Sequence, residues 1–576
     1  MTQLTTPYNF VPLSNTVYFP PWAQASQLSH DAPLQNGWCG TLRIRITAST
    51  PLLVAGTQNG AERHPVKVMD KYAIPGSSLR GMLRNVLEIA TFGKFGRAVN
   101  DRAMSIRDLT PSSDVYRQQI NDHTVHAGWL KLASGNGTQL AAIEPTEKLR
   151  MDVVEAKEWA DETKSEGKDS YEMYTEEIDP DTRKLTDWVV VRTGSVPKKR
   201  EDFLFRHLPS KPALPISRDL FQQFAAAHQN NPLWANKQGQ PGDLQKRLMG
   251  GMRIPVFFIY DPKNKTRIQA FGLAYMFRVP YRHSLHDAIG FSGTAHHDQS
   301  RLDFCEALLG LIHDGEENHP ASLRSRVGFG LALATQAKPH PDKLGIDVVL
   351  NEPKPSFYPA YISPDKNGNA KTLMSERPQL AGWKRYPVRG QAAPQNTNVS
   401  IKGKTNDNIG SKLFPLQTGA TFEGDITLHN IHPEELGGLL WALTWGQQPH
   451  LRHSLGMGRP FGLGSIQIEV TQLDLRHNAD ASQDMHHSTA KDPSALAQAI
   501  QHLLQPFAQA MELGVKNWAS SDQMKELQAM ANPALGDRTA PQLRYMPLED
   551  HRLVKGGKGN TAQTLKRFTV ITQPQR

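Results

Sequence analysis

The sequence has little cysteine and no long apolar run. Its 576 residues contain 2 Cys, Cys39 and Cys305, which lie far apart in the chain. This number excludes a disulfide-stapled secreted scaffold and a zinc ribbon or finger. No stretch approaches the roughly 18 consecutive apolar residues of a membrane span, and residues 1–15 lack the features of a signal peptide. We therefore expect a cytoplasmic protein with no membrane partner.

The sequence also lacks the common catalytic motifs. It has no Walker loop, no Gly-x-Ser-x-Gly elbow and no His-Glu-x-x-His sequence. The pairs His296-His297 and His486-His487 are candidate metal ligands, but histidine pairs in polar loops are usually only solvated. Cys305 lies on an apolar face, which indicates a buried and inert thiol. We therefore expect no resident cofactor.

The charge of the chain is basic. Lys and Arg number 65 against 56 Asp and Glu, a formal net charge of +9. A basic excess is typical of proteins with an anionic partner, most often nucleic acid. In a chain of this length it is also compatible with an ordinary basic surface, so charge alone leaves both interpretations open.

Two separated segments show regular hydrophobic patterns. Apolar residues alternate over 42–46 and predict a strand with one buried face, and apolar residues at helical spacing over 79–90 predict a helix. Ser77 or Ser78 could cap that helix. Residues 422–470 repeat the pattern as strand, helix and strand. The two segments together predict a split βαβ sheet of ferredoxin-like or RNA-recognition type.

Changes in composition divide the chain into five parts. Residues 1–36 form an extended arm, and 37–95 form the first part of an α+β core. Residues 96–250 are an insertion with dense mixed charge, 251–475 complete the core and contain a hairpin within 254–276, and 476–576 form a helical extension with a basic tail. The predicted fold is therefore an α+β core with a large insertion and a helical C-terminal extension.

The start of the helix near residue 76 is the first candidate binding segment. The first turn of a helix has unpaired N–H groups that bind phosphate. Ser77 and Ser78 add hydroxyl groups, and Arg80 and Arg84 add guanidinium groups. The alternative is a solvated face on which Arg84 pairs with Glu88 one turn later.

A glycine-rich loop at residues 456–464 is the second candidate. Its spacing and its position before a strand do not match a dinucleotide-binding fingerprint. Its four glycines still allow the backbone to approach a ligand closely, and Arg459 adds a positive charge. The alternative is a loop whose glycines serve only a tight chain reversal.

Six segments in a fixed order resemble the RAMP superfamily, the repeat-associated proteins that form the backbone of type III CRISPR effector complexes. The pairing of PGSSLRG with a C-terminal GxGxPxGxG loop is the specific feature. LAGWKRYPV (380–388) and other intermediate pieces resemble a large-insert branch of the superfamily. The six segments are TPLLVAG (50–56), IPGSSLRGMLR (74–84), LDFCEALLG (302–310), SRVGFGLAL (325–333), ELGGLLWAL (435–443) and GMGRPFGLGSI (456–466).

The resemblance implies a guide-RNA-binding backbone subunit of a type III CRISPR interference complex in antiviral defence. Its partners would be guide RNA, target RNA and other effector subunits. The residues implied to hold the guide backbone are Ser77, Ser78, Arg80, Arg84, Gly458, Arg459 and Gly462. Phosphate contacts of this kind give affinity and register, and base pairing of the guide gives sequence choice.

The loop at residues 60–70 bears on RNA cleavage. Cleaving members of the superfamily resemble one another in an Asp just before a residue-plus-Pro step, and Arg63 occupies that position here. Glu62 and Asp70 are the carboxylates that could hold a divalent cation, whereas Arg63, His64 and Lys67 could only contact phosphate. We favour a non-cleaving or weakly cleaving subunit. The alternatives are an endoribonuclease that cuts target RNA or the guide precursor, and a protein-binding scaffold.

Overall fold

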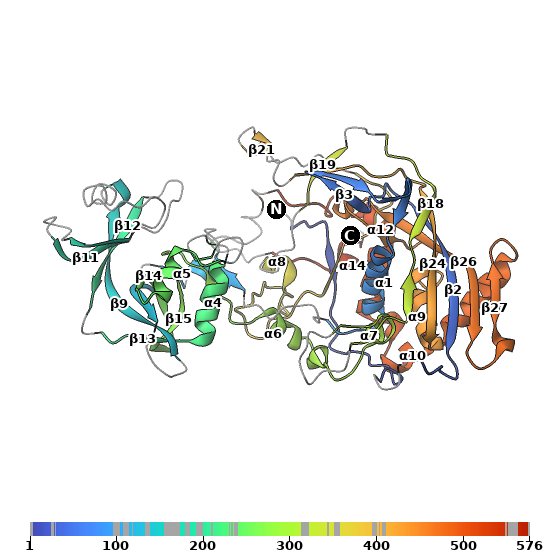
Figure 1. Ribbon diagram of the computed structural model, residues 1–576, viewed down its shortest axis with the longest axis horizontal. Helices are drawn as coiled ribbons and strands as arrows, with labels where there is room; N and C mark the ends of the chain where they lie inside the picture. Colours follow the sequence, from blue (N-terminus) through green and yellow to red (C-terminus); the bar gives the residue numbers. More distant parts are fainter. Residues whose placement is uncertain are drawn as a thin grey trace.

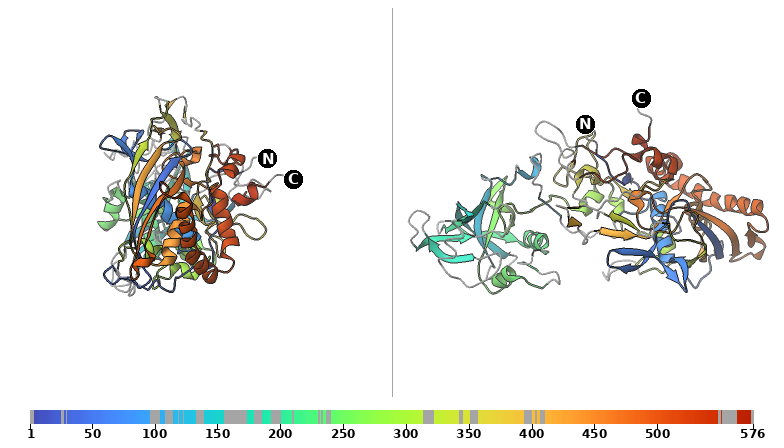
Figure 2. Two further views of the ribbon diagram at one scale, coloured as in Figure 1. Left: turned by 90° about the vertical axis from the view of Figure 1, so that its right-hand side faces the viewer. Right: turned by 90° about the horizontal axis from the view of Figure 1, so that it is seen from above.

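The structure is a computed structural model in which two lobes lie side by side (Figures 1 and 2). The charged stretch at 155–169 and most of the predicted basic tail at 555–567 lie outside the described residues. The structure describes residues 4–24, 28, 30–95, 104–107, 114–117, 119–121, 123–132, 139–154, 173–178, 185–191, 200–208, 211–229, 231, 234–235, 240–312, 322–341, 345–350, 357–393, 400–401, 404–405, 410–547, 550 and 563–573.

The core lobe is built on an antiparallel sheet (Figure 1). Its central strand, β2 (Trp38–Ala48), pairs with β24 (Thr421–Ile431) on one side and β26 (Ser465–His477) on the other. Beyond β24 lie β17 (Val327–Phe329) and β18 (Ala332–Gln336), which together form one interrupted strand. Numbered along the chain, the strands stand in the order fourth, first, third, second. This order is that of a ferredoxin-like sheet, so the predicted fold class is confirmed.

The helices predicted after the first and third core strands are present. α1 (Gly76–Ala90) and α9 (Pro433–Thr444) belong to the same buried cluster as the alternate apolar residues of β2. The predicted cap is wrong in detail. Pro75 is the N-cap residue of α1 and no side chain caps the helix, because the helix already begins at Gly76. Ser77 and Ser78 therefore lie in its first turn.

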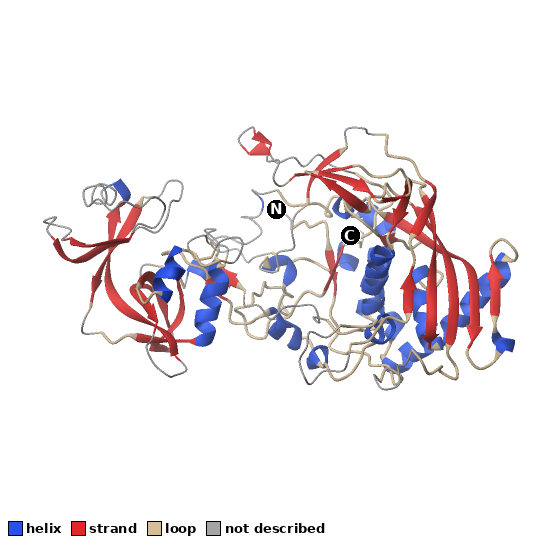
Figure 3. Cartoon of the chain, in the orientation of Figure 1, coloured by secondary structure: helices blue, strands red, loops and turns tan. Residues whose placement is uncertain are grey.

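The C-terminal extension packs against α9 (Figure 3). Its longest helix, α10 (Pro493–Gly514), approaches α9 where Gly437 and Gly438 follow each other. A Cβ at Gly437 would lie 2.6 Å from a backbone oxygen of α10, and one at Gly438 would lie 2.6 Å from a ring atom of α7 (Phe304–Leu309). The two glycines therefore allow both neighbours to pack closely on α9. None of the helices in the described ranges is long and apolar enough to cross a bilayer.

The insertion lobe is a second, mostly antiparallel sheet (Figure 2). Its centre is formed by β12 (Glu201–His207), β9 (Gln139–Asp152) and β8 (Val125–Leu132). The predicted hairpin is present as β14 (Ile254–Asp261) and β15 (Asn264–Gly272), and β14 pairs with β8. The predicted boundary at residue 250 thus falls inside this sheet, because β14 is an apolar strand that needs a partner in the insertion.

The edges and one face of the insertion sheet are completed by shorter elements. β10 (Met173–Ile178) and β11 (Leu185–Val191) extend it beyond β12, and β13 (Leu214–Ser217) pairs with β9. α4 (Arg218–His228) and α5 (Asp243–Met249) pack against its strands and bury Phe224 and Leu248 among others. The lobe therefore has its own hydrophobic core.

The N-terminal arm is extended, as predicted, but it is docked on the core lobe. β1 (Asn9–Val11) pairs antiparallel with β20 (Trp383–Arg385), with Phe10 opposite Lys384. Phe10 and Val11 are buried. Burial of these apolar side chains and the strand pairing fix the arm beside the segment that follows residue 383.

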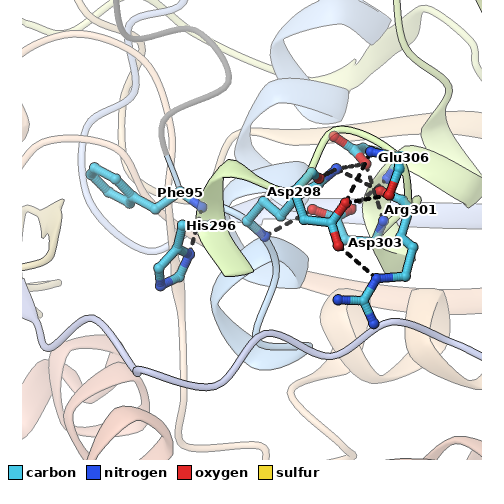
Figure 4. A network of polar contacts seen from close by, with 8 residues as sticks. Phe95, His296, Asp298, Arg301, Asp303 and Glu306 are labelled. Carbon is cyan, nitrogen blue, oxygen red and sulfur yellow. Dashed lines mark hydrogen bonds and ion pairs between the residues drawn. The ribbon is translucent and has the colours of Figure 1, made fainter. Parts of the chain in front are cut away.

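A buried network of polar side chains holds α7 in place (Figure 4). The Lys94 ammonium forms an ion pair of 2.8 Å with Glu306, which caps α7 together with Asp303. Burial and the nearby Glu306 raise the pKa of Asp303 to about 6. His296 is buried as well and bonds to the Phe95 N–H and the Ser14 carbonyl oxygen. His296 therefore has a structural role, and the described residues contain no group of three or more potential metal ligands.

The buried imidazole of His453 predicts a loss of stability in acid. Burial lowers the pKa of His453 from 6.5 to about 3, and its ring stacks on Trp445. The unfolded chain therefore takes up a proton below pH 6.5 that the folded chain does not. This linkage lowers the free energy of unfolding by about 2 kcal/mol between pH 7 and pH 5. In urea unfolding at pH 7 and pH 5, His453→Gln should lose this part of the decrease in the free energy of unfolding. An equal decrease in the variant and the wild type would contradict the prediction.

Candidate anion-binding site

The two segments singled out in the sequence lie on one pocket. Ser77 and Ser78, at the start of α1, face a hollow of about 440 Å³ that is also lined by Gly456 and Arg459 of the glycine-rich loop. α1 starts directly after β6 (Lys71–Ile74), which pairs with β18, so the sheet fixes the position of the helix start. The core fold thus brings together residues that lie almost 400 positions apart in the chain.

A third segment lines the pocket, and sequence reasoning assigned it no role at a site. Lys384 and Arg385 of β20 and the following Tyr386 line the pocket together with Asn85 of α1. The Asn85 side-chain oxygen accepts a hydrogen bond of 2.6 Å from Arg385. The sequence did carry a signal, since two adjacent cations between Trp383 and Tyr386 form the basic and aromatic pattern typical of nucleic-acid binding.

The pocket is electropositive because its cations are not balanced. No carboxylate is among its lining residues, and no described residue forms an ion pair with Lys384, Arg385 or Arg459. Burial and the charge of Arg459 lower the pKa of Lys384 to about 8 and that of Arg385 to about 10. Burial also lowers the pKa of Arg459. The protein therefore holds three cations close together at a cost in free energy.

Tyrosine side chains position two of these cations. The Lys384 ammonium lies 4.0 Å from the ring centre of Tyr8 and donates a hydrogen bond of 2.8 Å to the Tyr361 hydroxyl. The Arg459 guanidinium lies 5.0 Å from the ring centre of Tyr386. These cation–π contacts compensate only part of the charge. Because Tyr8 belongs to the N-terminal arm, the docked arm helps to hold Lys384 at the pocket.

Gly458 and Gly462 do not line the pocket, but they set the course of the glycine-rich loop. Both have positive φ angles, 74° and 80°, and they flank the short helix η2 (Arg459–Phe461). A Cβ at Gly462 would lie 2.7 Å from the Gln391 carbonyl oxygen. These glycines therefore serve the chain reversal, and the reversal presents Arg459 to the pocket, so both interpretations of the loop contribute.

Arg80 and Arg84 are engaged inside the protein. One Arg80 nitrogen donates a hydrogen bond of 2.5 Å to the Leu309 carbonyl oxygen at the end of α7. The Arg84 Nε donates one of 2.7 Å to Glu88, the i,i+4 pair that the sequence suggested. Neither residue lines the pocket. Their position favours a role in joining α1 to its surroundings over direct contact with RNA.

The predicted RNA-binding residues of the 60–70 loop lie on a separate hairpin. Glu62, Arg63 and His64 belong to β4 (Glu62–Pro65), which pairs with β3 (Ala55–Asn59). A Glu62 carboxylate oxygen lies 3.1 Å from the His64 Nε2. Arg63 donates hydrogen bonds to backbone carbonyl oxygens of the same loop. The Glu62–His64 hydrogen bond thus joins two half-buried side chains of the same strand.

Lys67 and Asp70 lie one hairpin further along the chain. The Lys67 ammonium is 4.8 Å from the ring centre of Tyr72, and both residues belong to the β5 (Lys67–Val68) and β6 hairpin. Asp70 occupies the turn of that hairpin with a φ of 62°. The two candidate carboxylates, Glu62 and Asp70, therefore lie on different elements.

On the solvent-facing side of the core sheet, two arginines of β2 are balanced by carboxylates of β24. Arg43 and Arg45 of β2 pair across the sheet with Asp425 and Glu423 of β24, each at 2.9 Å. The solvent-facing positions of these two strands carry no Phe, Tyr or Trp. RNA-recognition domains stack bases on aromatic residues of the sheet. Among the residues that the structure describes, the pocket combines cations with Tyr386, whereas the exposed positions of β2 and β24 lack aromatic side chains.

The fold and the pocket define an α+β protein with a ferredoxin-like core and a cavity lined by cations. The family model described as RAMPs, the RAMP superfamily, matches residues 45–176, which include the end of β2 and all of α1. This match over residues 45–176 confirms the resemblance to the RAMP superfamily seen in the sequence motifs.

Two further comparisons add little to this assignment. The solved structure of Csc2 from Thermofilum pendens is similar at 10% identity, over 93% of this chain and 96% of that chain, with a TM-score of 0.25. A TM-score this low does not establish a shared fold. A search of curated proteins finds no match.

Proposed function

We propose that the protein is a guide-RNA-binding backbone subunit of a type III CRISPR interference complex, acting in antiviral defence in the cytoplasm. The observation that carries the proposal is the meeting of the α1 start, the glycine-rich loop and β20 at one cationic pocket. The match of residues 45–176 to the RAMP superfamily model supports the proposal. A resemblance to this superfamily implies a backbone subunit of a CRISPR effector complex.

Such a subunit would hold the sugar–phosphate backbone of the guide. Hydroxyl groups of Ser77 and Ser78 and the charges of Lys384, Arg385 and Arg459 can contact phosphate oxygens. These contacts fix register and give affinity without reading bases, so target choice would follow from base pairing between guide and target RNA. Neighbouring effector subunits would continue the guide-binding track.

The direct test is the RNA that the full chain carries. The protein is produced together with a CRISPR array, purified, and its bound RNA is sequenced. We expect repeat-derived RNA of defined length, with an affinity that falls steeply as salt rises. Recovery of no RNA, or of RNA without repeat sequence, would contradict the proposal.

RNA cleavage is the second candidate function, and the Glu62–His64 hydrogen bond favours it. A carboxylate-oriented imidazole can act as a general base toward a ribose 2′-hydroxyl. If this pair cleaves RNA, Glu62→Gln should slow cutting by about 100-fold, whereas Asp70→Asn in the neighbouring turn should leave the rate unchanged. The measurement is single-turnover cleavage of labelled guide precursor and target RNA with and without a divalent cation. Equal rates in wild type and Glu62→Gln would exclude this role.

A further inference from the structure

We propose that the pocket is a seat for a single phosphate group, held by Lys384, Arg385 and Arg459 together with the N-terminus of α1. The inference rests on the proposed function in that the phosphate belongs to bound RNA, and it adds that all three cations and the helix start converge on one phosphate group. Neither the matched family region, residues 45–176, nor the motifs of the sequence assign a role to Lys384 or Arg385.

The charge of the pocket is the first reason. Three cations line a hollow of about 440 Å³, and no carboxylate is among the described residues that line it. Arg385 is 8% exposed. In the part of the chain that the structure describes, Lys384, Arg385 and Arg459 have no ion-pair partner. A buried cation without a counter-ion is costly and is retained where an anion completes the site. The pocket therefore needs negative charge from a ligand.

The available donors match the geometry of a phosphate. The Arg385 Nε is buried and has no hydrogen-bond partner, while its other end is fixed by Asn85. The first turn of the 15-residue helix α1 adds backbone N–H groups and the Ser77 and Ser78 hydroxyls. Phosphate, with several acceptor oxygens around one centre, can accept from guanidinium, ammonium, hydroxyl and helix N–H groups at once.

The phosphate could be an internal phosphodiester or a terminal phosphate of the RNA. Both present the same tetrahedral oxygen acceptors, and they differ in charge. Binding experiments with RNA that differs only in its 5′ end distinguish the two sources.

The first experiment needs no RNA. Melting of the full chain is compared in potassium phosphate and potassium chloride at equal ionic strength and pH. We expect phosphate to raise the melting temperature by about 2 °C. Lys384→Met and Arg459→Gln should lose this response and melt no lower than wild type in chloride, because each removes an unbalanced cation. Lys525→Met and Arg476→Gln, two exposed residues outside the pocket, serve as matched controls and should keep it.

Three melting results would overturn the inference. They are an equal melting temperature of wild type in both salts, a phosphate response that survives in both pocket variants, and pocket variants that melt lower than wild type in chloride. Because no RNA is present, these results are independent of the guide-RNA proposal.

The second experiment identifies the source of the phosphate with labelled single-stranded RNA carrying a 5′-hydroxyl or a 5′-phosphate. A tenfold loss of affinity for both RNAs in the pocket variants supports an internal phosphodiester. If wild type binds the 5′-phosphate RNA more tightly and the pocket variants bind both RNAs with the affinity of the 5′-hydroxyl RNA, the result supports a terminal phosphate. Unchanged affinity for both RNAs overturns the inference while leaving RNA binding intact. Absence of RNA binding by wild type, beside a positive phosphate response, contradicts the proposed function alone.

Discussion

Lys384→Glu combined with Arg459→Glu should weaken guide-RNA binding by at least about 100-fold, since removing one partner of a buried charge contact costs about 2 kcal/mol or more. Both side chains line the pocket where the start of α1 and the glycine-rich loop meet. The reversed charges would repel the RNA backbone at the same place. The measurement is the dissociation constant for repeat-derived RNA at fixed salt, together with its salt dependence, which should become shallower.

The matched control changes the same number of charges elsewhere. Lys525→Glu with Arg476→Glu alters net charge identically at exposed positions outside the pocket. It should lower affinity only slightly, through the long-range field. Equal losses in the two double variants would mean that net charge, and not the pocket, accounts for RNA binding. Retained affinity in the pocket variant would place the RNA elsewhere on the protein.

Arg326→Met should lower the free energy of unfolding of the core lobe by about 3–5 kcal/mol, because it leaves a buried carboxylate without its partner. The Arg326 guanidinium is fully buried and forms an ion pair with Glu435 of α9. It also donates hydrogen bonds to the carbonyl oxygens of Asn430, at 2.8 Å, and Ala307, at 3.0 Å. Arg326 directly precedes β17, and its side chain thus connects this part of the chain with three other elements, β24, α7 and α9. Chemical unfolding of the full chain, followed by tryptophan fluorescence, measures the loss.

The double variant Arg326→Met with Glu435→Gln separates the ion pair from packing. A glutamine retains the oxygen that accepts from the His432 N–H at the start of α9. Replacing both charges is usually close to neutral, so the double variant should recover most of the lost stability. A double variant as unstable as Arg326→Met would show that the packing of the arginine stem, and not the charge pair, supports the core.

Local sequence patterns determined the main elements of the core. Alternation over residues 42–46 and helical spacing over 79–90 depend only on which face of an element is apolar, and the structure contains β2 and α1 at these places. The resemblance to the RAMP superfamily was recognisable for the same reason, because its motifs are short and local. The pattern could not show that β14 belongs to the insertion sheet, since an apolar strand does not specify its partner.

The site was determined only partly by the sequence. Ser77, Ser78 and Arg459 were identified from the chemistry of a helix start and a glycine-rich loop, and all three line the pocket. Arg80 lies on the same helix, yet its guanidinium bonds to the end of α7. Lys384 and Arg385 reach the pocket through the pairing of β20 with the N-terminal arm.

The sequence by itself therefore determined the α+β class, the order of strands and helices in the core, and two of the three segments that line the cavity. Tertiary structure decided which cations converge on it and which are used to pack helices together. The physical reason is that backbone patterning is encoded within a few residues, whereas the environment of a charged side chain depends on segments hundreds of residues away.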